Sequence, residues 1–592
     1  MKSHIAIVEK EKCHPTKCGH ECMKYDPLNR NVPDSGFHLN AVSGKAEIAE
    51  EVVMQFHSIC AKMCPFDAIK IVKLPEALKE EPLHQFGENA FRLYKLPVLK
   101  KGEIVGILGR NGIGKSTALN ILAGMIVPNL GEFEHKGNTE AVVKKFSTMT
   151  IGEYFRNLYG KKVVVSYKPQ RIELLPQQYK GTVQNLLSKV DERNVVKDLV
   201  REIELENLLQ RDLSMLSGGE LQKVAIIAAI AKKADVYYFD EPASFLDITS
   251  RIKVAKMIRS LKEENVAVVV VEHDLATLDY VSDGIQIVYG EQAAYGIFSQ
   301  SKGVRRGVNE YLDGFLPEDN VRFRPYKIMF QRAPPRRTAG KEKLLEFPAV
   351  EKKFDAFHLK VNSGCFYGGE VLAVMGANGL GKSTFLKMLA GLVKPDVGSI
   401  TPVKVAYKTQ YPEAFEGNVL EHLKKVARSE FESGWFQQNI MEKLNLKAVM
   451  HSDIASLSGG ELQKFYIACT LASDANIIAM DEPSAFIDVE DRLNVAEVIK
   501  TFTETKGVST IVVDHDVQFV DYLGDAMLVF EGVPGREGHV HGPCNKEEGM
   551  NRVLKMLDIT YRKDKVTNRA RINKSGSQLD QEQKQTGKCY YS

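Results

Sequence analysis

The chain has 592 residues, of which 44% are hydrophobic and 26% are charged, and its formal net charge is +3. These values exclude a disordered chain and a polycation, and the length suffices for roughly four domains. The longest apolar runs, such as residues 224–231 and 266–271, are shorter than the roughly 20 residues that a membrane helix needs, so we expect a cytoplasmic protein without a membrane span.

The cysteines concentrate near the N-terminus, where five of the nine precede residue 65. In a cytoplasmic chain such a cluster favours metal binding over disulfides. Two runs have the approximate spacing of ferredoxin cluster motifs, and the last residue of each run precedes a proline. The first run comprises Cys13, Cys18, Cys22 and Asp26, and the second comprises Met54, His57, Cys60 and Cys64.

The two runs are expected to exchange their last ligands. In ferredoxins with two clusters, the fourth residue of one run binds the cluster of the other run. This rule groups Cys64 with the three cysteines of the first run and leaves a second set with a single thiolate. We therefore expect one [4Fe–4S] cluster on Cys13, Cys18, Cys22 and Cys64, with zinc as the alternative occupant, and no second cluster on Asp26, Met54, His57 and Cys60.

Two phosphate-binding loops follow apolar strands. Residues 104–108 and 371–375 predict buried strands, and each is followed by a Gly-x-x-x-x-Gly-Lys-Ser sequence. The backbone amides of such a loop surround phosphate oxygens, its lysine neutralises the β- and γ-phosphates, and its serine ligates Mg²⁺. The expected ATP-binding residues are Gly109, Asn111, Gly112, Gly114, Lys115, Ser116 and Thr117 in the first loop, and Gly376, Asn378, Gly379, Gly381, Lys382, Ser383 and Thr384 in the second.

Farther along the chain, a short apolar strand ending in Asp-Glu-Pro follows each loop. We expect Asp240 and Asp481 to reach the Mg²⁺ shell, and Glu241 and Glu482 to polarise the attacking water as general bases. Apolar strands that alternate with helices indicate an α/β fold with a buried, mainly parallel sheet. The chain therefore carries two ATP-hydrolysing motif sets.

The sequence Leu-Ser-Gly-Gly-Glu-Leu-Gln occurs in both sets, at residues 216–222 and 457–463, and it resembles the signature of ABC-type ATPases. The resemblance implies twin P-loop ABC nucleotide-binding domains arranged head to tail, in which each signature completes the site of the other cassette. Ser217, Gly218 and Gly219 would then close on nucleotide held by Lys382, and Ser458, Gly459 and Gly460 on nucleotide held by Lys115. By the same resemblance, Gln170 and Gln410 are glutamine-loop residues at Mg²⁺, His273 and His515 contact the γ-phosphate, and residues 244–247 and 485–488 form the D-loops.

The two cassettes differ in length and in their aromatic residues. The interval from P-loop to signature is longer in the first cassette, and we place a helical insert near residues 139–161, as either a docking element or a surface extension. Phe91 or Tyr94 is expected to stack on adenine in the first cassette, with core packing as the alternative. Phe354 is the candidate for the same position in the second cassette.

Five regions are expected along the chain. They are a small α+β ferredoxin-like iron–sulfur domain at 1–80, a first ABC domain at 81–300, a hinge or linker at 301–342, a second ABC domain at 343–530, and a second hinge segment with a polar, partly disordered tail at 531–592. Residues 322–343 and 552–574 each carry eight Lys or Arg. Such runs suit nucleic-acid phosphates or form solvated linkers.

A ferredoxin-like domain followed by twin ABC cassettes resembles the ABCE family of ribosome-recycling ATPases, the RNase L inhibitors. Similar strings lie at residues 111–119, 315–324 and 571–574, whereas the second cluster set departs from the family's cysteines. The resemblance implies ATP-driven splitting of post-termination or stalled ribosomes with a class-one release factor or Pelota. It also implies contacts with rRNA, the small subunit and initiation factors, and no DNA or membrane partner. The alternative is an ABC translation factor or initiation-complex scaffold that binds ribosomes without splitting them.

Overall fold

The computed structural model describes residues 4–74, 81–330, 336, 340–401, 403–410 and 412–590. The chain divides into two compact units. The boundary expected near residue 80 and the prolines at 334 and 335 lie outside the described residues. The first unit holds Met1–Pro242, Met257–His273 and Val281–Tyr326, and the second holds Ala243–Lys256, Asp274–Tyr280 and Lys327–Ser592.

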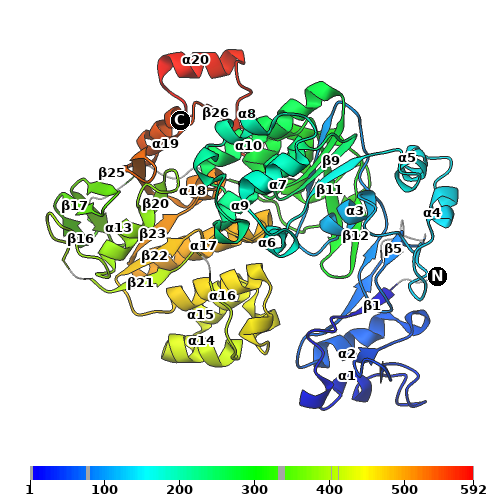
Figure 1. The fold of residues 1–592 in the computed structure, drawn as a ribbon. Helices are drawn as coiled ribbons and strands as arrows, with labels where there is room; N and C mark the ends of the chain where they lie inside the picture. The colour runs from blue at the N-terminus through cyan, green and yellow to red at the C-terminus, as the bar shows by residue number, and fades with distance from the viewer. Residues whose placement is uncertain are drawn as a thin grey trace. The chain divides into compact units, whose positions relative to one another are not determined.

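The N-terminal segment of the first unit is a small α+β domain, drawn in blue in Figure 1. Strand β1 (His4–Val8) pairs antiparallel with β4 (Ile69–Lys73), and the short β2 (His38–Leu39) pairs with β3 (Ala46–Glu47). Helices α1 (Glu21–Lys24) and α2 (Ser58–Met63) each carry residues of one cysteine run. The core includes Ala6, Val8, Phe37, Ile48 and Cys60.

The first cassette is built on a sheet in the order β5-β6-β12-β11-β7-β10-β9-β8. Strands β11, β7, β10, β9 and β8 run parallel, and apolar residues fill most of them because both faces are covered. The strands are β5 (His84–Gln85), β6 (Arg92–Leu93), β7 (Ile104–Leu108), β8 (Val165–Lys168), β9 (Val236–Asp240), β10 (Ala267–Val271), β11 (Gly284–Glu291) and β12 (Tyr295–Phe298). The helices are α3 (Lys115–Leu122), α4 (Thr139–Lys145), α5 (Thr150–Tyr159), α6 (Leu175–Gln178), α7 (Val183–Val190), α8 (Val196–Glu202) and α9 (Gly218–Ala231). The next helices in the chain, α10 (Ile248–Ser260) and α11 (Leu275–Val281), lie largely within the second compact unit.

The second cassette repeats this topology with the sheet order β17-β18-β25-β24-β20-β23-β22-β21. Outside this sheet, β16 (Lys343–Phe347) pairs antiparallel with β19 (Gly364–Tyr367) in a separate two-stranded sheet. The sheet strands are β17 (Val350–Lys353), β18 (His358–Val361), β20 (Glu370–Met375), β21 (Val405–Lys408), β22 (Ile477–Asp481), β23 (Ser509–Val513), β24 (Ala526–Val533) and β25 (Glu537–Asn545). The helices are α13 (Lys382–Leu389), α14 (Val419–Ala427), α15 (Gly434–Phe436), α16 (Gly459–Leu471), α17 (Val489–Lys506), α18 (Val517–Leu523), α19 (Lys546–Met556) and α20 (Gln578–Thr586).

The insert at 139–161 consists of α4 and α5, and its aromatic residues face the core of the first cassette. Phe155 is fully buried, and the Tyr154 hydroxyl donates to the Leu122 carbonyl at 2.5 Å and lies 2.8 Å from the Tyr238 hydroxyl. Burial raises the pKa of Tyr154 to about 12, so the hydroxyl stays protonated and holds α5 against the P-loop helix α3.

The segment expected to link the cassettes belongs in part to the first one. Strand β13 (Lys302–Gly303) pairs with β11, and the amphipathic α12 (Val304–Asp313) packs on β11. A short hairpin of β14 (Phe315–Leu316) and β15 (Val321–Arg322) follows. The Arg324 guanidinium is buried and donates to the carbonyls of Tyr311 and Leu312. At least one cation of the 322–343 run therefore serves the fold rather than a solvated linker.

The expectation of a partly disordered tail after residue 530 is wrong for the described residues. Strand β25 pairs antiparallel with β24 inside the second sheet. Strands β26 (Tyr561–Lys563) and β27 (Ala570–Ile572) then form a hairpin, and α20 follows. Cys589 and Tyr590 are buried in a core cluster with Tyr561 and Ile572. A few apolar residues, spaced widely among polar ones, anchor this segment in the core. The polar composition of the segment as a whole therefore wrongly indicated disorder.

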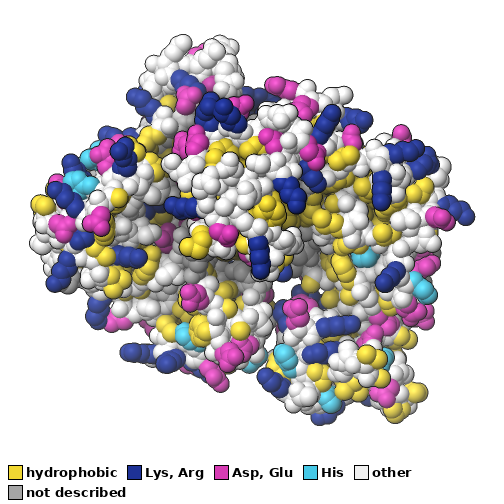
Figure 2. All heavy atoms as spheres, in the orientation of Figure 1, with side chains coloured by type: hydrophobic (Ala, Val, Ile, Leu, Met, Phe, Trp, Pro, Cys, Tyr) yellow, Lys and Arg dark blue, Asp and Glu magenta, His cyan; other side chains and the backbone are white. Residues whose placement is uncertain are grey.

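Among the residues described here, no helix combines the length and apolar composition needed to cross a bilayer. Figure 2 shows lysine and arginine side chains interspersed with aspartate and glutamate on the face drawn, in keeping with the small net charge.

Candidate nucleotide and metal sites

Each P-loop folds around its own lysine. Strand β7 ends at Leu108, and α3 begins at Lys115, whose ammonium donates to the carbonyls of Gly109 (2.9 Å) and Arg110 (2.6 Å). Lys382 does the same with Gly376 (2.8 Å) and Ala377 (2.9 Å). Both lysines are buried. The two loops therefore hold a cation where phosphate oxygens bind in P-loop proteins.

An aromatic ring packs against the last glycine of each loop. Gly114 has φ +90°, and a Cβ built there would lie 2.6 Å from the Phe91 ring. Gly381 has φ +92°, and its Cβ would lie 2.9 Å from the Phe357 ring. Phe357 is thus the counterpart of Phe91 in this contact, and adenine stacking by Phe91, Tyr94 or Phe354 stays a prediction. Phe354 is 48% exposed, and its ring lies under the Lys352 ammonium instead.

The aspartates that end β9 and β22 lie beside the P-loop serines. The Ser383 hydroxyl donates to Asp481 at 3.0 Å, and burial raises the pKa of Asp481. Burial and the neighbouring Glu241 carboxylate raise the pKa of Asp240 to about 6, against a hydrogen bond from Ser116. The Oδ1 of Asp240 is buried without a hydrogen-bond partner in the described structure. A hydroxyl beside an unsatisfied carboxylate fits Mg²⁺, which prefers oxygen ligands.

The predicted bases, glutamines and histidines converge in both cassettes. The Gln170 amide donates to Glu241 at 2.7 Å, and the His273 Nε2 lies 3.4 Å from the same carboxylate oxygen. In the second cassette the Gln410 amide donates to Glu482 at 2.6 Å, and the His515 Nε2 lies 3.6 Å away. Residues far apart in sequence therefore meet at one carboxylate in each site.

Both glutamates adopt a left-handed backbone conformation, with φ 48° at Glu241 and φ 45° at Glu482. Such a conformation costs free energy for a residue with a side chain, and it is concentrated at functional sites. The strands β9 and β22 end at the preceding aspartates, and the left-handed conformation turns the chain at each glutamate. The same strain in both copies supports a role for this geometry in the chemistry.

The two glutamates differ in charge environment. Burial would raise the pKa of Glu241, but hydrogen bonding to His273 and the nearby His273 and Lys115 cations bring it down to about 2. Burial raises the pKa of Glu482 to about 7, and the carboxylates of Asp514 and Asp481 add to the increase. Asp514 stands where the first cassette has Glu272. His273 lowers the pKa of Glu241, whereas burial and two carboxylates raise that of Glu482.

Four buried side chains that the sequence analysis did not single out support the two acids. The Lys168 ammonium donates to the Asp240 carbonyl at 2.8 Å, and that of Lys408 donates to the Asp481 carbonyl at 2.9 Å. The amides of Gln222 and Gln463 donate to the Glu241 and Glu482 carbonyls at 2.8 and 2.6 Å. These residues belong to the Tyr-Lys-x-Gln and Gly-Glu-Leu-Gln strings, which occur in both cassettes. Their repetition was the feature of the sequence that could have indicated a shared role.

Each signature serine caps the helix that it opens. Ser217 precedes α9, and its hydroxyl and amide both donate to the Glu220 carboxylate at 2.8 Å. Ser458 precedes α16 and bonds Glu461 in the same way. Both serines are exposed, so the N-termini of these helices are accessible. The hydrogen bonds described for Ser217 and Ser458 lie within their own capping boxes and do not involve a P-loop.

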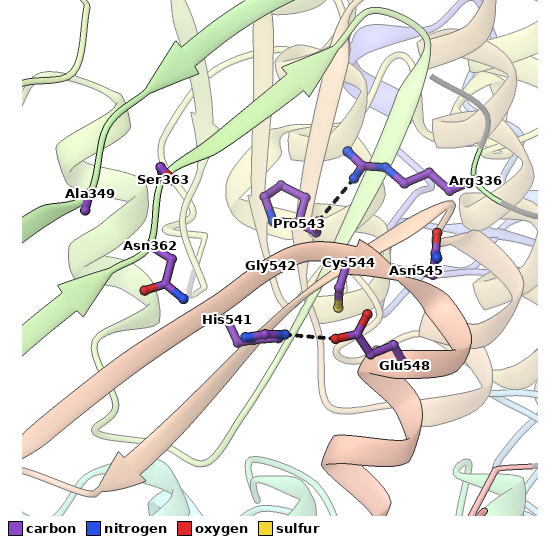
Figure 3. Close-up of a pocket in the computed structure, with 10 residues that line it drawn as sticks. All are labelled: Arg336, Ala349, Asn362, Ser363, His541, Gly542, Pro543, Cys544, Asn545 and Glu548. Atoms are coloured by element: carbon purple, nitrogen blue, oxygen red, sulfur yellow. Dashed lines mark hydrogen bonds and ion pairs between the residues drawn. The ribbon is translucent and has the colours of Figure 1, made fainter. Parts of the chain in front are cut away.

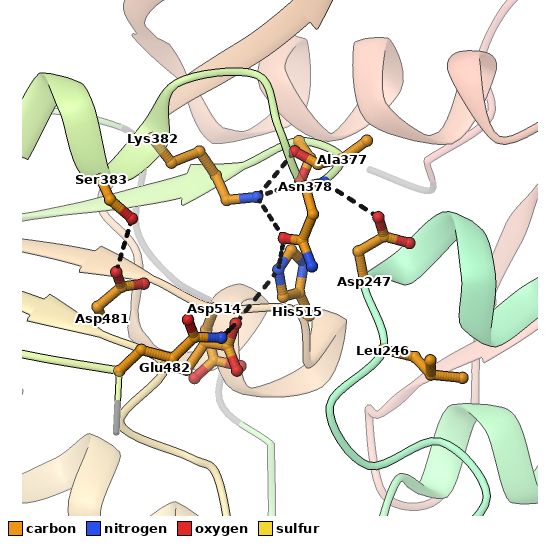
Figure 4. A network of polar contacts seen from close by, with 12 residues as sticks. Leu246, Asp247, Ala377, Asn378, Lys382, Ser383, Asp481, Glu482, Asp514 and His515 are labelled. Carbon is orange, nitrogen blue, oxygen red and sulfur yellow. Dashed lines mark hydrogen bonds and ion pairs between the residues drawn. The ribbon is translucent and has the colours of Figure 1, made fainter. Parts of the chain in front are cut away.

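Within the second unit, the D-loop aspartate Asp247 contacts the second P-loop. Its carboxylate accepts from the Asn378 backbone amide at 3.0 Å (Figure 4). It also accepts from the Ser250 backbone amide at 2.8 Å. Burial would raise the pKa of Asp247, but the neighbouring His515 and these amides bring it down to about 2. The Asn378 side chain also lies 3.2 Å from the His515 Nε2. Asp247 is therefore a site residue that its D-loop string alone did not identify as one.

The cysteines of the complete set surround one cavity in the N-terminal domain. Cys13, Cys18, Cys22 and Cys64 line it together with Phe66, and it is partly open to solvent. Among the described residues, these cysteines do not form a group whose sulfur atoms all lie within 4.8 Å of one another. A single zinc ion needs sulfur atoms about 3.8 Å apart. The cavity therefore fits a multi-iron cluster better than one zinc ion.

Three residues of the second set, Asp26, His57 and Cys60, form a buried polar cluster. The Asp26 carboxylate accepts from the Leu28 amide (2.9 Å) and the Phe37 amide (2.7 Å) and lies 3.5 Å from the His57 Nε2. Asp26, His57 and Cys60 are fully buried, whereas Met54 is 49% exposed. A Cβ at Gly36 would lie 2.1 Å from Asp26, so the chain packs tightly around this carboxylate. These residues fill the space with hydrogen bonds and leave a poor ligand set for iron.

Comparisons with known proteins agree with the two motif sets. The protein family described as ABC transporter matches residues 98–244 and 359–485. The family described as a possible Fer4-like domain in RNase L inhibitor matches residues 3–31. An uncharacterized ABC transporter ATP-binding protein of Methanocaldococcus jannaschii is 44% identical over 99% of this chain and 97% of its own length. The translation initiation factor RLI1 of Saccharomyces cerevisiae is 38% identical over 100% of this chain and 98% of its own.

Solved structures extend the similarity to the whole fold. A model of ribosome-bound archaeal Pelota and ABCE1 contains a chain that is 46% identical, with a TM-score of 0.94 over 100% of this chain and 99% of its own. A complex of the archaeal ribosomal stalk protein aP1 with the recycling factor aABCE1 gives 46% identity and a TM-score of 0.82 over 87% of this chain and 100% of that one. The chain is therefore an ABC ATPase, and it belongs to the RNase L inhibitor family, the E family of ABC proteins.

Proposed function

We propose that this protein is an ATP-driven ribosome recycling factor that splits post-termination or stalled ribosomes into subunits. The observation that carries the proposal is the similarity, along the whole chain, to ABCE1 bound to a ribosome with Pelota. Its partners are the ribosome, the small subunit and rRNA, a class-one release factor or Pelota, and the ribosomal stalk. Its place of action is the cytoplasm, where these partners assemble.

The residues of each site divide the work of hydrolysis. Lys115 and Lys382 bind the β- and γ-phosphates, and Glu241 and Glu482 orient and deprotonate the attacking water. His273 and His515 hold the γ-phosphate. Mg²⁺, when bound, neutralises charge that develops on the phosphates, and its protein ligands are Ser116, Gln170, Asp240, Ser383, Gln410 and Asp481.

The signature residues act across the pair of cassettes. By the family resemblance, Ser217, Gly218 and Gly219 complete the site of Lys382, and Ser458, Gly459 and Gly460 complete that of Lys115. The exposed helix N-termini of α9 and α16 support this role, because such termini attract anions. ATP then joins the cassettes and its hydrolysis releases them.

The N-terminal domain holds one [4Fe–4S] cluster on Cys13, Cys18, Cys22 and Cys64. The cysteine-lined cavity supports this site, and the buried Asp26–His57 pair argues against a second cluster. Iron and acid-labile sulfide are measured on anaerobically purified protein. About four irons per chain are expected; about eight, or zinc alone, would refute the assignment without touching the recycling function.

The recycling function is tested on purified ribosomes that carry Pelota or a release factor. With this protein and ATP, sucrose gradients should show free subunits, and without ATP they should show intact ribosomes. The name of the yeast relative favours a second candidate, an initiation factor that binds the small subunit without splitting ribosomes. Binding to small subunits with unchanged intact ribosomes would support that candidate and reject recycling.

A further inference from the structure

Three side chains with metal-binding atoms meet where the second cassette passes from β25 to α19. His541 and Cys544 lie on β25, and Glu548 lies in the first turn of α19. One ligand atom from each lies within 4.8 Å of the others, and no other such group occurs among the described residues. Figure 3 shows the three side chains on one side of the strand, with His541 facing Glu548.

We propose that His541, Cys544 and Glu548 bind a zinc ion. Zinc takes imidazole, thiolate and carboxylate ligands in tetrahedral geometry, and three protein ligands leave a fourth position for water. Tetrahedral coordination at normal bond lengths places ligand atoms roughly 3.3–3.7 Å apart. His541 Nε2 and Glu548 Oε1 are already 3.0 Å apart. The Cys544 Sγ lies within 4.8 Å of a ligand atom of each of the other two residues. A side-chain movement of about 1 Å would therefore bring the sulfur to the distance that zinc coordination requires.

The backbone around the three residues is firmly held. Cys544 pairs with Met527 in the β24–β25 ladder, and its thiol donates to the Met527 carbonyl at 3.5 Å. Glu548 follows in a helix that packs on the same strand. Ligands on a paired strand and an adjoining helix turn lose little entropy when they bind a metal. The site would join the end of β25 to the start of α19.

The surroundings leave room for a water ligand. A hollow of about 650 Å³, widely open to solvent, is lined by His541, Cys544 and Glu548 together with Asn362, Ser363 and Asn545. The amide and hydroxyl side chains of this lining can bond a zinc-bound water. The hollow also gives an ion a route from solvent to the three ligands.

The nearby cations already have other carboxylate partners. The Arg552 guanidinium lies 3.8 Å from Glu548 but 3.2 Å from Glu531, and Arg336 is bonded to Glu370. Zinc would therefore replace the His541–Glu548 contact and the weaker contact of Arg552 with Glu548. Binding must also displace the thiol proton, because burial raises the pKa of Cys544 to about 11. The competing interpretation is a His–Glu ion pair beside a buried thiol that binds nothing.

Zinc content separates the two interpretations. The full chain with its iron–sulfur cluster is equilibrated with zinc, freed of excess, and assayed for zinc and iron. Wild type should hold one more zinc per chain than His541→Ala, Glu548→Gln or Cys544→Ser at the same iron content. The matched controls are His539→Ala, an exposed histidine on the same strand, and Cys365→Ser, a half-buried cysteine on β19, and both should keep the wild-type zinc.

Equal zinc in wild type and His541→Ala would overturn the proposal, as would the loss of zinc in the controls. His541 and Glu548 are partly exposed, so their variants remain informative if Cys544→Ser does not fold. Thermal unfolding gives a second readout. Zinc should raise the unfolding temperature of wild type and leave that of His541→Ala unchanged, because only the folded site binds the ion.

Discussion

Glu241 and Glu482 hold corresponding positions in the two cassettes, yet the charged groups around their carboxylates shift the two pKa values in opposite directions. The His273 hydrogen bond and nearby cations keep the pKa of Glu241 at about 2. Burial and the Asp514 carboxylate put the pKa of Glu482 at about 7. A general base works only when deprotonated, so the second site should lose its base first on acidification.

This difference predicts distinct pH profiles for the two single-site variants. ATP turnover of Glu241→Gln, which depends on Glu482, should fall as pH drops from about 8 to about 6. Turnover of Glu482→Gln, which depends on Glu241, should stay level from pH 8 to about 7 and should fall only nearer pH 6, where Asp240 gains a proton. Adding Asp514→Asn to Glu241→Gln should move the fall to lower pH, because a neighbouring negative charge is removed. Identical profiles for both variants would contradict the assignment of these two environments.

Some site residues could be predicted from sequence because their spacing is set by the loop that they form. The P-loop lysines and serines and the strand-end acids belong to that class. The contact of Phe357 with Gly381 was not predicted, because an aromatic contact with a glycine is not encoded by a fixed string. Phe357 nevertheless precedes Gly381 by nearly the same number of residues as Phe91 precedes Gly114. Lys168 and Lys408 were missed because buried lysines are rare, and only the fold shows that each bonds the carbonyl of the aspartate that ends the neighbouring strand.

At the scale of elements, the C-terminal hairpin is anchored to α11 by one carboxylate. Asp279 accepts from Arg571 at 2.7 Å and from Arg569 at 3.2 Å, within the second unit. The Arg569 side chain is fully buried. These arginines belong to the 552–574 run, which charge counting favoured as a phosphate contact or a solvated linker. Burial of the partner, which sequence does not show, decides their role.

Removing this carboxylate should destabilise the protein strongly. Asp279→Ala leaves the Arg569 cation buried without its ion-pair partner, which costs about 3–5 kcal/mol in comparable cases. The matched control is Glu531→Ala, which removes a partly exposed partner of Arg552 and should cost about 1 kcal/mol or less. Urea unfolding of the second cassette measures both values. Equal losses in the two variants would show that the Asp279 contact does not anchor the hairpin.

For the molecule as a whole, the duplicated motifs predicted two α/β cassettes, and the two sheets do share one strand order. That inference succeeded because each motif ends a strand or begins a helix. The edges of the cassettes were harder to predict. β25 continues the second sheet beyond residue 530, and α12 joins the first cassette, because weakly apolar strands and amphipathic helices gain their stability from neighbours that only the fold supplies.

The central claim is that ATP hydrolysis at two complete sites drives repeated ribosome splitting. Glu241→Gln combined with Glu482→Gln keeps the P-loop lysines and Mg²⁺ ligands but removes both general bases, which should slow hydrolysis by roughly a hundredfold or more. In the direct measurement, ribosomes carrying Pelota are incubated with ATP and with about 0.1 equivalent of this double variant per ribosome. The products are then resolved on sucrose gradients. We predict one round of splitting at most, with the variant held on the small subunit, whereas wild type splits the whole pool. Complete splitting by the double variant at the wild-type rate would contradict the account.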